Sequence, residues 1–227
     1  MWMQSEPSML TAPNLLSSGL VEVVTTALDG LTYRDGKGSA AGAARQVKQN
    51  QEADADQGGY ADIERMIKQA MAGSTLVGSY ARPIRWSRLI FSRYAVGDAY
   101  GEHVDAPFMR ADDGSEMRAD LSFTAFLTGP EAYDGGELVL DTPWGRHAVK
   151  LEAGSVVVYP TSVLHFVAPV RSGVRQVCVG WMQSRIRDHE QRTMMFDLER
   201  SISGLAQDEN RRRLTRVFAG LLKMWSS

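Results

Sequence analysis

Apolar residues recur at helical spacing near both ends of the chain. Residues 13–30 place them roughly at i, i+4 and i+7, and residues 60–72 return to this spacing, so both predict amphipathic helices that cover a core. Beyond Ser184 the spacing comes back in two stretches that Gly204 can separate. These stretches predict a C-terminal helical hairpin whose wide apolar face packs on the core or on a second subunit, which would give a homodimer.

Between the helical ends the pattern changes to short runs rich in β-branched and aromatic residues, separated by Gly and Pro. Several short strands at this spacing indicate a β-sandwich or a barrel. The expected strands are residues 85–94, 119–127, 136–140, 146–151, 155–159 and 174–183. We therefore predict a mainly β protein with flanking helices. Its main domain spans 1–183, with helical support over 1–83 and a β core over about 84–183, and the hairpin follows over 184–227.

Composition limits the function classes without choosing one. The chain has 227 residues, 44% of them hydrophobic, and a formal net charge of −2, so no global basic field favours nucleic acid or an acidic membrane surface. Its single cysteine cannot form an internal disulfide. No segment resembles a secretion signal, and no apolar run approaches the roughly 20 residues of a membrane helix, so we expect a cytoplasmic protein.

His103 and Asp105 can form part of a metal site. They flank one residue in a stretch that reads as strand, and because strand side chains alternate between faces, both point to one side. His165 follows in a distant strand that would return to close a barrel. Two histidines and one carboxylate, with coordination positions left open, are the ligand set of non-haem Fe(II) oxygenases. With such a site inside, the double-stranded β-helix, or jelly roll, is the expected core.

Arg175 suggests what else the site binds. Alternation places Arg175 on the same strand face as Val177, Val179 and Trp181, which are plausible interior residues. A guanidinium there needs an anion, and its planar fork suits a carboxylate bidentately. A dicarboxylate that chelates iron at one end leaves its second carboxylate for this anchor. The cosubstrate inferred from these residues is 2-oxoglutarate.

Further motifs accompany these residues in a fixed order. They are the runs Arg93 to Asp105, Leu121 to Leu127, Tyr133 to Leu138, Ala153 to Ser155 and Tyr159 to His165, with Val47 to Gln51 upstream and Trp181 to Ser184 and Ile186 to Asp188 downstream. Together they resemble the bacterial PKHD-type hydroxylases, Fe(II)- and 2-oxoglutarate-dependent relatives of prolyl hydroxylases, over nearly the whole chain.

This resemblance implies a function and a set of roles. It implies a dioxygenase over residues 1–183 that hydroxylates its substrate and releases succinate and CO2. Iron would be held by His103, Asp105 and His165, and 2-oxoglutarate by Arg175, with ascorbate as a reductant. In related prolyl hydroxylases a tyrosine near the position of Tyr94 contacts the cosubstrate, so Tyr94 is a further candidate. The hydroxylated substrate, a protein side chain or a small molecule, is not indicated.

Two other functions fit the metal ligands alone. A non-catalytic iron-binding β-helix could use them for regulation, although it would need no anchor like Arg175. A zinc hydrolase could also use them, but it would want a nearby general base. Ser122 and Thr124 share one strand face, and the sequence leaves open whether they contact the cosubstrate, because polar strand residues most often face solvent. The loops at 34–59 and 105–118 are expected to decide the substrate. Of these, 34–59 is rich in Gly, Ala, Gln and Asp and is expected to be a mobile loop, able to act as a lid.

Overall fold

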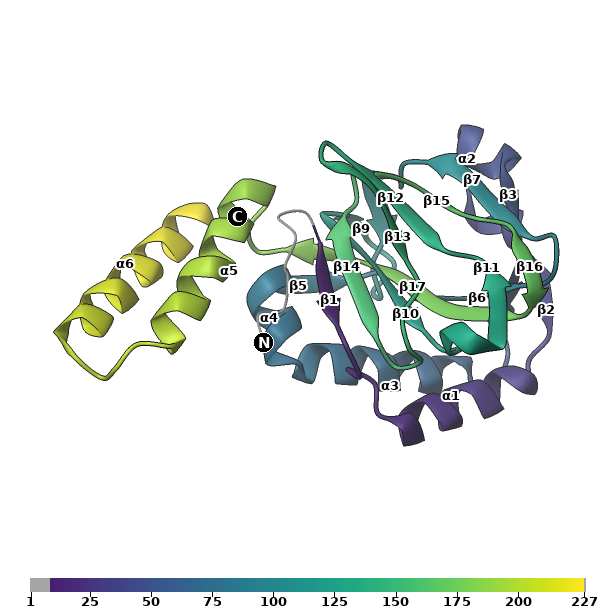
Figure 1. Ribbon diagram of the computed structural model, residues 1–227, viewed down its shortest axis with the longest axis horizontal. Helices are drawn as coiled ribbons and strands as arrows, with labels where there is room; N and C mark the ends of the chain where they lie inside the picture. The colour runs from purple at the N-terminus through teal and green to yellow at the C-terminus, as the bar shows by residue number, and fades with distance from the viewer. Residues whose placement is uncertain (1–8, 227) are drawn as a thin grey trace.

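Two β-sheets face each other at the centre of the computed structural model, which describes residues 9–226 (Figure 1). The larger sheet has the order β1 (Leu10–Ala12), β14 (Val156–Pro160), β10 (Leu121–Phe126), β17 (Arg175–Ser184), β6 (Ile90–Tyr94), β4 (Gln51–Ala53), β2 (Tyr33–Asp35), and β5 (Pro83–Trp86) also pairs with β17. The smaller sheet has the order β13 (Gly145–Val149), β12 (Leu138–Thr142), β15 (Leu164–Val167), β7 (Ala99–His103), β3 (Lys48–Gln49). The predicted jelly-roll core is confirmed.

Two short ribbons complete the β structure. One pairs β11 (Tyr133–Gly135) with β16 (Val170–Gly173), after the short helical turn η2 (Pro130–Ala132), and the other pairs β8 (Phe108–Arg110) with β9 (Glu116–Arg118). Each of the six predicted strand segments overlaps at least one observed strand, and 85–94 overlaps both β5 and β6. The short edge strands and ribbons were not predicted, because runs of two to four residues carry too little alternation to be recognised.

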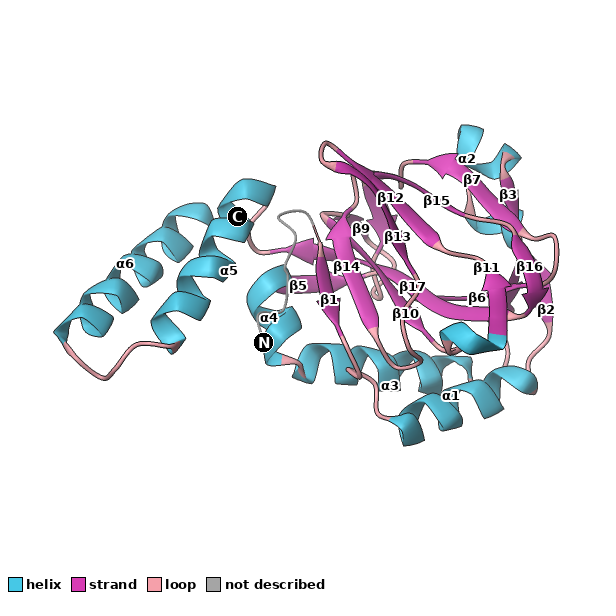
Figure 2. Ribbon diagram, viewed as in Figure 1, coloured by secondary structure: helices cyan, strands magenta, loops and turns pink. Residues whose placement is uncertain are grey.

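The larger sheet is buried on both faces, and strand alternation explains how. In β14, Val156 and Val158 join a core formed with the helices, whereas Val157 and Tyr159 point into the space between the sheets. The helices α1 (Ser18–Asp29), α3 (Tyr60–Gly73) and α4 (Thr75–Ala81) cover the outer face of this sheet (Figure 2). The sequence predicted α1 and α3 but not α4. The inner face is therefore left for a site.

The C-terminal hairpin has the predicted form, with α5 (His189–Ser203) ending at Gly204 and α6 (Glu209–Trp225) after it. It projects away from the sheets (Figure 1). α5 is anchored to the rest of the protein by the Phe196 ring, which packs edge-on against Tyr80 of α4 at 5.4 Å. α6 contacts the rest of the protein through the Phe218 ring, over which the Arg82 guanidinium lies at 5.1 Å. None of the described side chains of α6 is buried. No helix within residues 9–226 is both long and apolar enough to cross a membrane.

The expectation of an unstructured loop over residues 34–59 is wrong. This segment holds η1 (Gly36–Ser39), α2 (Gly42–Gln46) and the strands β3 and β4. It crosses from one sheet to the other, because β3 pairs with β7 and β4 pairs with β6. Buried Lys48 pairs with Glu52 and donates a hydrogen bond to Ser39 Oγ, which ties the segment together. The residue composition of 34–59 could not predict these contacts, because they form only when both sheets are in place.

Gly180 of β17 offers a direct test of the packing behind the larger sheet. A Cβ added there would lie 2.5 Å from Leu89 Cδ2 and 2.8 Å from the Phe123 ring, and both side chains are buried. We expect Gly180→Ala to lower the free energy of unfolding by about 1–3 kcal/mol, as overpacking does. Chemical denaturation measures this change.

Gly78→Ala is the matched control, because an added Cβ in this α4 glycine meets nothing within 4 Å. Helix propensity then favours alanine by about 0.5–1 kcal/mol. Equal effects of the two substitutions would contradict the packing described for Gly180.

Candidate metal centre

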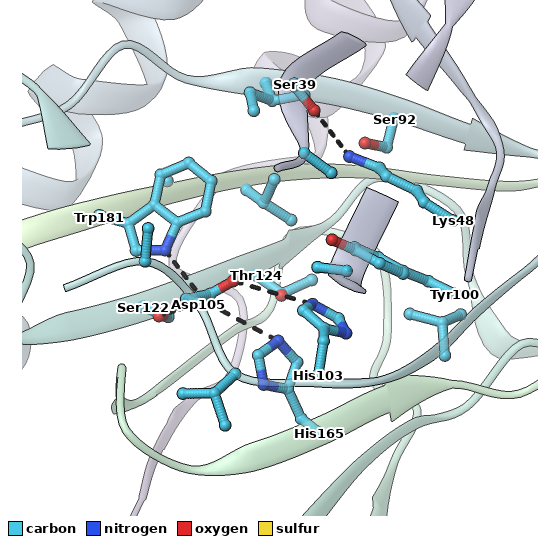
Figure 3. Close-up of a pocket in the computed structure, with 18 of the residues that line it drawn as sticks. Ser39, Lys48, Ser92, Tyr100, His103, Asp105, Ser122, Thr124, His165 and Trp181 are labelled. Atoms are coloured by element: carbon cyan, nitrogen blue, oxygen red, sulfur yellow. Dashed lines mark hydrogen bonds and ion pairs between the residues drawn. The ribbon is translucent and has the colours of Figure 1, made fainter. Parts of the chain in front are cut away.

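Three side chains predicted as metal ligands lie together between the sheets (Figure 3). His103 ends β7 and His165 lies on β15, and the two are directly paired across these strands. Asp105 lies just beyond the end of β7, so it is in a loop and not in the strand that the sequence predicted. One potential ligand atom from each residue lies within 4.8 Å of the others. The three side chains are therefore close enough to share one ion.

Both imidazoles direct their Nε2 atoms toward Asp105. His103 Nδ1 lies 2.8 Å from the Gly101 carbonyl and His165 Nδ1 lies 2.9 Å from the Val163 carbonyl. Because a carbonyl only accepts, each Nδ1 carries the proton and each Nε2 keeps a free lone pair. Burial, and next the neighbouring His165, lower the pKa of His103 to about 4. His103 is thus neutral near neutral pH, as a metal ligand must be.

Asp105 is held by two neutral donors. Ser122 Oγ–H donates to Asp105 Oδ2 at 2.7 Å, and the Trp181 indole N–H donates to the same oxygen at 3.0 Å (Figure 3). His103 Nε2 and His165 Nε2 each lie 3.8 Å from a carboxylate oxygen of Asp105. Two imidazole nitrogens and one carboxylate are the donor set of open-sided non-haem iron sites. The residues present thus fit Fe(II).

Arg175 lines the same cavity, which has a volume of about 450 Å³. It begins β17 opposite Tyr94 and is 1% exposed, yet it has no ion-pair partner among residues 9–226, and its Nε has no hydrogen-bond partner there. Its guanidinium faces the rings of Tyr94 at 5.0 Å and Phe126 at 5.7 Å. A buried cation with only aromatic neighbours lacks the anion that would compensate its desolvation. This geometry fits a ligand carboxylate.

The remaining predictions for the site differ in outcome. Tyr94 is buried and lines the cavity, and burial raises its pKa to about 12, so its hydroxyl stays protonated. Ser122 and Thr124, whose place the sequence left open, also line the cavity and are buried. The rule that polar strand residues face solvent fails here because both faces of β10 are covered.

Two further residues, Tyr100 and Lys48, lie beside the ligands. Tyr100 stacks on His103, with ring centroids 3.6 Å apart, and Lys48 lies over the Tyr100 ring at 5.0 Å (Figure 3). Both line the cavity. The sequence did not predict that Lys48 lies in the cavity, because its strand is only two residues long and shows no alternation. Trp181 was placed on the correct face, but its donor role depends on the position of Asp105, which local sequence does not reveal.

Comparisons with known proteins agree with this geometry. Residues 89–183 match the family model described as the 2OG-Fe(II) oxygenase superfamily. The chain is 40% identical to a PKHD-type hydroxylase of Hyphomonas neptunium, over 96% of this chain and 99% of the relative. It is 38% identical to one of Klebsiella pneumoniae, over 94% of this chain and 97% of the relative. A prolyl-4-hydroxylase structure from Pseudomonas putida shares the fold, with a TM-score of 0.56, 22% identity and coverage of 78% of this chain and 93% of that one.

The assignment of the ligands is tested by removing them singly. We expect His103→Ala, Asp105→Ala and His165→Ala each to abolish tight Fe(II) binding and to leave a folded protein, because each removes one of three converging donors. Anaerobic metal titration measures binding, and circular dichroism measures folding. His147→Ala is the control, since His147 lies on β13 and does not line the cavity. Wild-type metal content in all three ligand variants would contradict the site.

Proposed function

This chain belongs to the PKHD-type hydroxylases, Fe(II)- and 2-oxoglutarate-dependent dioxygenases, and we propose that it hydroxylates a C–H bond of its substrate with release of succinate and CO2. The observation that supports this most is Arg175, a buried guanidinium without an ion-pair partner among residues 9–226, in the same cavity as His103, Asp105 and His165. Ligand site and carboxylate anchor together match a metal-chelating dicarboxylate.

Each residue has a separate task in this proposal. His103, Asp105 and His165 hold Fe(II) and leave part of its coordination sphere open. When bound, Fe(II) supplies the dioxygen chemistry that converts 2-oxoglutarate to succinate and CO2 and oxidises the substrate. Arg175 grips the distal carboxylate of 2-oxoglutarate with its planar fork. Tyr94 lies opposite Arg175 in the β6–β17 pairing and would offer that carboxylate a protonated hydroxyl.

The cavity supports these tasks by fixing positions and excluding water. Its lining is largely apolar around the ligands and includes Val104, Pro107 and Met109 from the segment after β7. Such a lining strengthens the electrostatic interactions inside it and keeps substrate and cosubstrate in one orientation. The chain needs no acid–base pair for this reaction.

The two rival functions fit the cavity less well. A zinc hydrolase needs a general base, but Asp105 is the only carboxylate among the described residues that line the cavity, and neighbouring Glu102 pairs with Arg146 at the surface. A non-catalytic iron module needs no buried arginine. Burying an unpaired guanidinium is unfavourable, so its presence favours a protein that binds a carboxylate ligand.

Arg175→Ala tests the cosubstrate assignment without knowledge of the substrate. We expect the variant to bind Fe(II) but to lose roughly a hundredfold or more in 2-oxoglutarate affinity, because breaking a buried ion pair costs about 3–5 kcal/mol. Arg175→Lys keeps the charge but lacks the fork, so it should recover only part of the affinity. Anaerobic titration of the Fe(II) protein, followed by metal-to-ligand absorption, reports binding directly.

Arg192→Ala controls for the loss of a buried guanidinium as such. Arg192 is 2% exposed but lies in α5, outside the cavity. We expect the Arg192→Ala variant to bind 2-oxoglutarate with wild-type affinity. Unchanged affinity in Arg175→Ala would overturn the cosubstrate site and restore the iron module as the better reading. The substrate itself can be sought by incubating the iron-loaded protein with 2-oxoglutarate and cell extract. Mass spectrometry then identifies the molecule that has gained one oxygen.

The proposal also includes a homodimer formed through the hairpin. Val217 and Met224 of α6 are 48% and 75% exposed, and the rest of the protein does not cover this apolar face. We expect light scattering to report twice the monomer mass at micromolar concentration, and Val217→Glu to shift it toward the monomer. A monomer at high micromolar concentration would reject the dimer.

The remaining parts of the proposal concern conditions and domain limits. We propose that ascorbate serves as the reductant that keeps the iron ferrous and that the enzyme works in the cytoplasm. We also propose that residues 1–183 form the dioxygenase domain and that 184–227 form an appended hairpin. The position of α5 and α6 outside the sheets supports this division (Figure 1).

A further inference from the structure

We propose that Trp181, together with Ser122, is a positioning residue that makes Asp105 a one-oxygen metal ligand. The inference rests on the proposed function, since it requires a metal at His103, Asp105 and His165. It adds a role that the ligand set alone does not give. The indole orients the carboxylate and does not itself bind the metal.

The two hydrogen bonds to Asp105 end on the same oxygen. Ser122 Oγ–H and Trp181 Nε1–H both donate to Oδ2, at 2.7 and 3.0 Å. A carboxylate oxygen offers about two lone-pair sites, so these donors occupy the acceptor capacity of Oδ2. Oδ1 receives no hydrogen bond from the described residues and keeps its lone pairs for the metal. The carboxylate is thereby fixed in rotation as well as in place. His103 Nε2 lies 3.8 Å from Oδ1 and His165 Nε2 lies 3.8 Å from Oδ2, so the carboxylate stands between the two imidazoles.

Asp105 needs this restraint more than the other two ligands do. His103 and His165 lie on paired strands, and each imidazole is locked by a carbonyl of its own chain segment, Gly101 or Val163. Asp105 follows the end of β7 and has no strand ladder around it. Its side chain reaches across to the larger sheet, where both donors lie. It is therefore the ligand whose position depends on contacts between the sheets.

The larger sheet presents the two donors as one unit. Ser122 of β10 and Trp181 of β17 are directly opposite each other in the β10–β17 pairing, so their side chains lie side by side on the inner face. The Trp181 backbone is fixed twice by Ser87, which accepts from its N–H at 2.9 Å and donates to its carbonyl at 3.0 Å. Ser122 is 2% exposed, and Thr161 Oγ1 lies 3.2 Å from its Oγ.

An indole suits this role chemically. It is a neutral donor without an acceptor, so it orients the carboxylate without competing for the metal or cancelling the ligand charge. An arginine or lysine in its place would pair with Asp105, and a histidine could ligate the metal itself. The ring also forms part of the cavity wall. Partners that orient a ligand in this way typically change metal affinity by about 10–100-fold when removed.

Trp181→Phe tests the proposal, because it removes the N–H donor and keeps an aromatic ring in the wall. Co(II) serves as the probe, since its visible absorption reports the coordination around the metal. We expect Trp181→Phe to bind Co(II) about 10–100-fold more weakly than wild type and with a changed visible spectrum. Ser122→Ala should shift both readouts in the same direction, and the double variant should bind more weakly than either single one.

Trp86→Phe is the matched control. Trp86 lies on β5, also paired with β17, is similarly half-buried and packs against Phe123, but it makes no contact with Asp105. It should bind Co(II) with wild-type affinity and spectrum, and thermal unfolding of each variant confirms that it is folded. Wild-type affinity and spectrum in Trp181→Phe would overturn the proposal, as would equal losses in Trp181→Phe and Trp86→Phe. If wild type itself bound no Co(II) or Fe(II), the metal site and hence the proposed function would fail first.

Discussion

The antiparallel pairing of β17 with β6 and β10 is the constraint on which the rest of the structure depends. One strand carries Arg175 at its start and Trp181 toward its end, both on the inner face. Its other face contributes Cys178 and Met182 to the core beneath the helices. A slip by one residue would exchange these faces and bury the guanidinium among the helices. The core residues therefore fix the register that places the functional residues.

Burial of Arg175 is the least favourable part of this arrangement, because its desolvated charge has no anionic partner among residues 9–226. The aromatic rings of Tyr94 and Phe126 stabilise the cation by up to about 2 kcal/mol when desolvated, which is less than a buried ion requires. Under the proposed function, a ligand carboxylate would supply the rest. Because strand pairing holds the Arg175 backbone, the anchor would be preorganised for a ligand whose carboxylate lies at the matching distance.

The alternation of side chains along the strands made it possible to predict much of the site from the sequence. The alternation around Arg175 placed it with Val179 and Trp181 from sequence alone, and His103 and His165 were correctly placed together. Prediction failed where position depends on contacts between distant segments. The placement of Ser122 and Thr124 stayed open, because local sequence does not reveal that a second sheet covers β10. The segment 34–59 was read as a loop, because its order depends on the pairing of β3 and β4 with two different sheets.

The cavity likewise has two parts. One is held by strands of the main sheets, and the other is formed by short elements between them. The histidines and Arg175 lie on strands of the two main sheets, whose ladders fix them. Much of the outer wall comes from short elements, η1 and α2 on one side and the β8–β9 ribbon on the other. The first is held by the Lys48, Glu52 and Ser39 contacts and by the pairing of β3 and β4 with the two sheets. His103, His165 and Arg175 instead take their backbone positions from the strand pairs of the main sheets, so changes in the outer wall can reshape the cavity without moving them. Under the proposed function, substrate choice and catalytic chemistry would then be specified by different parts of one cavity.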